Sequence, residues 1–93
     1  MIYEVIWTSR FKQTYKLAQK CGLPMHELKD VVEKLRADQD LDESYRDHEL
    51  KGSKKGIREL HIKPDWLLCY KKTLATLTLT LISTGSHSDI FKK

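Results

Sequence analysis

The hydrophobic pattern of the sequence changes its period near residue 45, and this change limits the folds open to the chain. Before that point, apolar residues recur every three to four positions, as on one face of a helix. After it they alternate with polar residues, most clearly from Thr76 to Leu81, as in a half-buried strand. A chain in which helices precede a run of strands is expected to form an α+β fold.

The first half of the sequence predicts one short strand and two helices. Residues 2–7 alternate well enough for the strand. Ser9 is expected to cap the first helix and Gly22 to end it, and Pro24 is expected to open the second. The apolar faces comprise Phe11, Tyr15 and Ala18 in the first helix, and Met25, Leu28, Val31, Val32 and Leu35 in the second.

The second half predicts an antiparallel meander of three strands. They are expected at residues 57–62, 66–72 and 76–81, with a Pro64–Asp65 turn between the first two. Alternation in the first of these strands places Glu59 and His61 together on its outer face. With the N-terminal strand added at one side and two antiparallel helices packed on it, the sheet makes a two-layer α+β fold, a single domain over residues 1–93.

Length and composition predict a small cytoplasmic protein. The chain begins without a positively charged leader, and no segment approaches the roughly 20 apolar residues that a membrane span needs. Neither of the two cysteines has a neighbour at zinc-finger spacing, which fits a reducing compartment and argues against a structural metal site. We therefore expect no metal, no cofactor and no membrane contact.

Positive charge is concentrated in the second half of the chain. Residues 1–47 contain 8 Lys/Arg and 9 Asp/Glu, a net charge of −1, whereas residues 48–93 contain 9 and 4, a net charge of +5. Such a field would speed and strengthen the encounter with a polyanion. A solvated lysine surface is the alternative interpretation.

Three of the four histidines lie in this basic half, among carboxylates and lysines: His48, His61 and His87. An imidazole with a pKa near ~6.5 can accept or donate a proton at neutral pH. RNA cleavage by the 2′-hydroxyl of the RNA itself requires a protein that positions the phosphodiester, removes one proton and supplies another. Acid–base ribonuclease is therefore the leading hypothesis.

The residues leave several roles open. His87 is assigned as the general acid. His61 could act as the base or hydrogen-bond the phosphate, and His48 is the competing base. Asp65 could orient a histidine or take the proton itself, or it could be only a turn residue. The side chains expected to hold phosphates are Lys51, Lys54, Lys55 and Arg58.

Two other classes of function use the same features. Trp66 and Tyr70 share a strand face and could stack on bases in a non-catalytic RNA-binding module, although aromatic residues in strands more often pack in the core. Alternatively, the basic face could belong to a pure interaction protein that receives an acidic partner.

Four segments of the basic half resemble a known family. Residues 47–53, 56–61, 64–71 and 84–91 closely resemble the YafQ branch of the RelE toxin superfamily, and the order of elements matches across almost the whole chain. The resemblance implies a toxin of a bacterial type II toxin–antitoxin pair. Such a toxin enters the ribosomal A site and cleaves mRNA without a metal when it is free of its antitoxin. The implied partners are mRNA, the ribosome and a cognate antitoxin with a DNA-binding end.

Carried over residue by residue, the resemblance implies a catalytic set of His48, His61, Asp65 and His87, with Phe91 shaping the site. Glu59 stands where the best-known member has aspartate, so the charge is kept on a longer arm. Lys54 and Lys55 stand where that relative has an aromatic residue and a lysine, which implies a stacking contact replaced by a charge.

Overall fold

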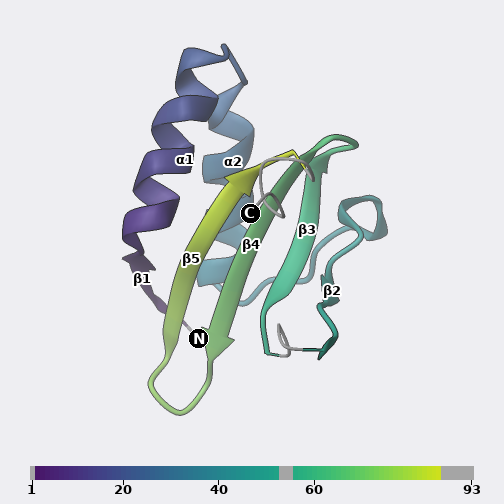
Figure 1. Cartoon of the computed structure of the whole chain (residues 1–93). Helices are drawn as coiled ribbons and strands as arrows, with labels where there is room; N and C mark the ends of the chain where they lie inside the picture. Colours follow the sequence, from purple (N-terminus) through teal and green to yellow (C-terminus); the bar gives the residue numbers. More distant parts are fainter. Residues whose placement is uncertain (1, 53–55, 87–93) are drawn as a thin grey trace.

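Five strands and two helices make up most of the computed structural model, which describes residues 2–52 and 56–86. In chain order the elements are β1 (Glu4–Trp7), α1 (Ser9–Lys20), α2 (Met25–Arg36), a 3₁₀ turn η1 (Glu43–Tyr45), β2 (His48–Glu49), β3 (Arg58–Lys63), β4 (Trp66–Thr73) and β5 (Thr78–Gly85). The strands form one sheet in the order β1-β5-β4-β3-β2. β1 runs parallel to β5, and the other neighbours are antiparallel. Both helices lie on one face of the sheet (Figure 1), so the predicted α+β fold is confirmed.

The start of α1 is attached to the sheet by its capping residue. Thr8 caps the helix, because its backbone is extended and its hydroxyl accepts a hydrogen bond from the Phe11 amide at 3.1 Å. The same hydroxyl lies 2.9 Å from the Leu81 carbonyl of β5. The predicted cap, Ser9, is instead the first helical residue. Gly22 follows the end of the helix with φ +76°, as its role as a helix stop requires.

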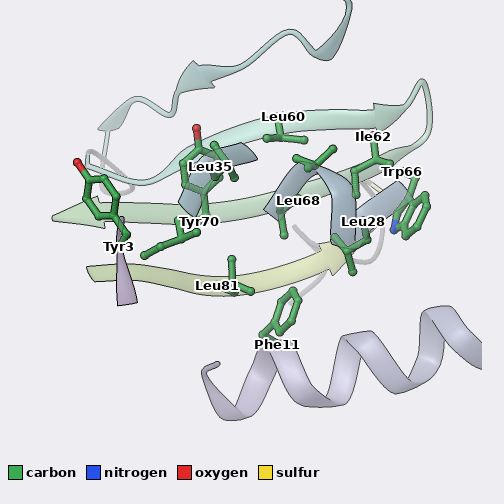
Figure 2. Packing of buried hydrophobic residues seen from close by; sticks show 12 residues of the cluster. Tyr3, Phe11, Leu28, Leu35, Leu60, Ile62, Trp66, Leu68, Tyr70 and Leu81 are labelled. Carbon is green, nitrogen blue, oxygen red and sulfur yellow. The ribbon is translucent and has the colours of Figure 1, made fainter. Parts of the chain in front are cut away.

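The core lies between the helices and the inner face of the sheet (Figure 2). α2 buries Leu28, Val31 and Leu35, three residues of its predicted stripe. They pack with Phe11 of α1 and with apolar strand residues that include Leu60, Leu68, Leu79 and Leu81. Full burial of one such leucine contributes about 1.5–3 kcal/mol. Within the described residues, neither helix has the length and apolar content needed to span a bilayer.

The predicted meander is formed by β3, β4 and β5, with two corrections. Leu77 was expected in the third strand but lies in the preceding turn, where its φ is +50°, and the strand begins at Thr78. A short strand, β2, pairs with the outer edge of β3 and was not predicted, and it carries His48. Two residues are too few to show an alternation in the sequence.

Trp66 and Tyr70 are packing residues rather than exposed stacking platforms. Trp66 is 3% exposed and Tyr70 is 1% exposed, and both belong to the core between the sheet and the helices (Figure 2). The indole Nε1–H of Trp66 donates to the Thr84 hydroxyl at 2.9 Å, which satisfies the polar end of a buried ring. The packing interpretation of these aromatic residues is confirmed.

Candidate active site

His48, Glu59 and His61 form a row on the outer face of the sheet, opposite the helices. His48 of β2 is the cross-strand neighbour of Glu59 in β3. Glu59 and His61 are two positions apart on the same strand, so they point to the same side. The structure therefore brings together three of the residues that the sequence singled out.

Glu59 is the buried member of this row. The sequence predicted that it would share a face with His61, which is correct, but the residue is only 2% exposed. Its Oε1 atom lies 3.5 Å from Nε2 of His48. A buried carboxylate is costly without polar or cationic partners, and His48 is placed to be one of them.

The His48 ring presents both of its nitrogens to oxygen atoms. Nδ1 lies 2.7 Å from the carbonyl oxygen of Arg46, and because a carbonyl only accepts hydrogen bonds, Nδ1 carries the proton. In a neutral ring with its proton on Nδ1, the lone pair of Nε2 faces the Glu59 carboxylate. With Nδ1 engaged by a backbone carbonyl, Nε2 is the ring atom that His48 presents to the Glu59 carboxylate.

Nδ1 of His61, like that of His48, faces a backbone carbonyl. Its Nδ1 lies 3.3 Å from the carbonyl oxygen of Pro64, which again places a proton on Nδ1 and makes Nε2 the basic nitrogen of the neutral ring. His61 also borders a hollow of about 570 Å³. Its other lining residues are Ser44, Tyr45, Arg46, Ile62, Lys63 and Pro64. Of its two cationic lining residues, Lys63 pairs with Glu27 at 3.0 Å.

Asp65 lies in the turn between β3 and β4 and is exposed. It borders a separate hollow of about 310 Å³ together with Trp66, Gly85 and Ser86. Gly85 is the last residue of β5, and His87 follows it two positions later in the sequence. His87 itself, together with Phe91, Lys54 and Lys55, lies outside the described residues.

Two of the predicted phosphate ligands can be placed. Lys51 is exposed on the loop between β2 and β3, whose turn uses Gly52 and Gly56 at φ +72° and +94°. The Arg58 side chain is 38% exposed, and its Nε donates to Oδ1 of Asp47 at 3.2 Å. Burial acts to lower the pKa of Arg58, but hydrogen bonding with Tyr70 and Asp47 and the carboxylate charge outweigh burial and raise it.

Asp47 and Tyr70 are polar neighbours of the site whose pairing the sequence did not predict. The buried Tyr70 hydroxyl donates to Oδ1 of Asp47 at 2.7 Å, the same oxygen that Arg58 contacts. Burial, and then the hydrogen bond to Asp47 and its charge, raise the pKa of Tyr70 well above its usual value. The position of Asp47 next to His48 pointed to a role at the site. Its hydrogen-bond partner Tyr70 lies 23 residues away in sequence, so the pairing left no local pattern.

Across residues 2–52 and 56–86, no three His, Cys, Asp or Glu side chains are grouped so that they could hold a metal ion. The described part of the row is instead an arrangement of two imidazoles and one carboxylate. All three groups can exchange protons, and a protonated imidazole can bind an anion.

Comparison with known proteins identifies the class of protein. A family model described as a bacterial toxin of type II toxin–antitoxin systems, YafQ, matches residues 3–92. The chain is also 36% identical over 89 residues to the mRNA interferase toxin YafQ of Escherichia coli K12, an alignment that covers 95% of each chain. These matches define the class as toxins of bacterial toxin–antitoxin systems. More closely, the chain belongs to the YafQ family, which confirms the resemblance seen in its sequence.

Solved structures agree with this assignment. The toxin in the E. coli DinJ–YafQ toxin–antitoxin complex superposes with a TM-score of 0.89 at 35% identity, and the match covers 98% of this chain and 99% of that one. A metal-bound toxin from Helicobacter pylori superposes with a TM-score of 0.90 at 38% identity, covering 98% of this chain and 100% of that one. The first relative is thus seen with an antitoxin and the second with a metal.

Proposed function

We propose that this chain is an endoribonuclease that cleaves mRNA, in the ribosomal A site, and so stops translation. The observation that carries the proposal is the row of His48, Glu59 and His61 on one face of the sheet. Imidazoles at this position are the groups that proton transfer to and from an RNA 2′-hydroxyl needs. The relationship to an mRNA interferase at 36% identity supports the same reaction.

The ring environments suggest different roles for the two described histidines. His61 is proposed as the general base, because its neutral ring keeps a basic Nε2 when Nδ1 faces the Pro64 carbonyl. His48, whose side chain is 50% exposed beside Glu59, is proposed to contact the phosphate and stabilise its developing charge. His87 remains the proposed general acid, and Asp65 is proposed to orient its ring, because β5 leads directly from Gly85 beside Asp65 to His87.

The proposed reaction is an attack of the RNA 2′-oxygen on the adjacent phosphorus. The base takes the 2′-hydroxyl proton, the P–O5′ bond breaks, and the acid protonates the departing 5′-oxygen. The products are a 2′,3′-cyclic phosphate and a 5′-hydroxyl. No electron transfer is involved, and the protein groups suffice to move the protons, so we propose that the reaction is metal-independent.

The test is cleavage of mRNA on purified ribosomes, and of free RNA in the presence of excess chelator, with end-group analysis of the fragments. We expect 5′-hydroxyl ends and no cleavage at a 2′-deoxyribose. His61→Ala should lower kcat by ~10²- to 10⁴-fold with little change in ribosome affinity. His26→Ala is the matched control, because His26 is an exposed histidine of α2. A strict need for added metal would contradict the metal-independent reaction.

RNA or ribosome binding without any cut product would favour the non-catalytic RNA-binding module instead.

We propose that a co-encoded antitoxin restrains the toxin, and the E. coli complex of a related toxin with DinJ supports this partner. Because residues 48–93 carry a net charge of +5, we propose that the antitoxin presents an acidic segment to this half. Co-expression with the neighbouring reading frame should restore growth and yield a stable complex.

A further inference from the structure

β2 carries His48 but is attached weakly by its own backbone. It has only two residues, it lies at the edge of the sheet, and its register pairs are His48 with Glu59 and Glu49 with Arg58 (Figure 1). Just before it, Arg46 adopts φ +53°, a conformation that a non-glycine residue seldom holds unaided. Backbone pairing of this length is expected to open readily.

A hydrogen-bonded cluster on the inner side of β2 provides the missing attachment. Oδ1 of Asp47 accepts from the Tyr70 hydroxyl at 2.7 Å and from Nε of Arg58 at 3.2 Å. Tyr70 is 1% exposed and belongs to the core, so its hydroxyl is a fixed donor (Figure 2). Arg58 is the cross-strand partner of Tyr70 as well as of Glu49, so the cluster joins β4, β3 and the start of β2.

Asp47 and His48 are consecutive, and consecutive residues of an extended chain point to opposite faces of a sheet. With Asp47 held on the inner side, His48 must point outwards, where Nε2 meets Glu59 at 3.5 Å and Nδ1 meets the Arg46 carbonyl at 2.7 Å. We propose that Asp47 is a positioning residue: through Tyr70 and Arg58 its carboxylate holds β2 on the sheet and keeps His48 facing Glu59. The consequence for catalysis rests on the function proposed above, whereas the placement of His48 does not.

The first test measures placement in the free protein. Asp47→Ala removes both contacts, and Tyr70→Phe removes one while keeping the ring in the core. In both variants, nitrogen-15 spectra of the imidazoles should show the His48 ring losing its distinct Nδ1-protonated signal, while His26 is unchanged. The amide of Leu50, which bonds to the Ile57 carbonyl at 2.8 Å, should exchange roughly tenfold faster or more. Asp38→Ala is the control, because it removes a carboxylate that pairs with Lys72 at 2.8 Å and has no part in β2.

The second test separates positioning from general stability. Asp47→Ala should lower kcat by up to ~10²-fold, as expected when a functional group is misplaced, with a smaller change in KM. On a His48→Ala background the same substitution should cause no further loss, because Asp47 acts through His48. An additive loss in the double variant would show a merely structural role and overturn the proposal.

The two proposals fail in different ways. If the wild-type protein cuts no RNA, the ribonuclease assignment is wrong, but the spectra and amide exchange still test the placement of His48. If those signals are unchanged in both Asp47→Ala and Tyr70→Phe, Asp47 does not position His48, whatever the activity. If Asp47→Ala does not fold, Tyr70→Phe alone decides, since its ring keeps the core filled.

Discussion

Tyr70 connects the hydrophobic core to the candidate site through a single phenol group. Its ring packs with the inner-face residues of the sheet, and its hydroxyl bonds to Asp47 beside His48. The pKa of Tyr70 is raised above its usual value of 10.0 by burial and by the adjacent carboxylate. The group therefore remains a hydrogen-bond donor at any pH at which the protein would work.

This raised pKa predicts how stability depends on alkaline pH. A group whose pKa is higher in the folded state contributes stability that is fully present below its unfolded pKa, near ~10, and is lost as pH rises beyond it. The free energy of unfolding, measured with denaturant, should therefore fall above about pH 10. Tyr70→Phe should reduce that fall, and Tyr15→Phe is the control that leaves Tyr70 in place. An equal alkaline loss in wild type and Tyr70→Phe would refute this account.

Among the elements, α1 is held to the sheet by hydrogen bonds between threonines as well as by apolar packing. The Thr84 amide of β5 donates to the Thr14 hydroxyl of α1 at 3.1 Å. The Thr84 hydroxyl accepts from Trp66 Nε1 at 2.9 Å and donates to the Leu67 carbonyl at 2.8 Å. This chain of bonds fixes the end of β5, from which the backbone continues towards His87.

Replacing Thr84 by valine tests this linkage. The substitution keeps the shape of the side chain but leaves the buried Trp66 N–H without its acceptor, which should cost about 1–3 kcal/mol of unfolding free energy. Thr76→Val is the matched control, because Thr76 is exposed in the turn before β5. This substitution should change the unfolding free energy by no more than about 0.5 kcal/mol. Chemical denaturation of both variants measures the difference, and equal effects would argue against the linkage.

At the scale of the whole molecule, charge divides the chain into two halves of different sign. The net charge is −1 for residues 1–47 and +5 for residues 48–93. The first half supplies both helices and β1, while the second supplies β2 to β5 and the row that contains His61. The positive charge therefore belongs to the part of the chain that carries the candidate active site.

This asymmetry predicts how RNA binding responds to salt. Each phosphate contact to single-stranded RNA contributes about 0.7 to the slope of log affinity against log salt. Lys51→Gln should therefore lower the slope by roughly that amount and weaken binding, with little change in kcat. Lys20→Gln, which removes a charge at the end of α1, is the control and should leave the slope unchanged. Filter binding or fluorescence anisotropy over a range of salt concentrations provides the slopes, and equal slopes would exclude Lys51 as a phosphate contact.

The sequence by itself determined the two helices, the meander and the shared face of Glu59 and His61, because side-chain periodicity is a local property of helices and strands. It also identified the family, through the segments around its histidines. Only the tertiary structure decided that β2 pairs with β3, that Glu59 is buried, and that Tyr70 meets Asp47. Those outcomes depend on contacts between residues far apart in the chain, and no local pattern records which distant partner will cover a side chain or accept its hydrogen bond.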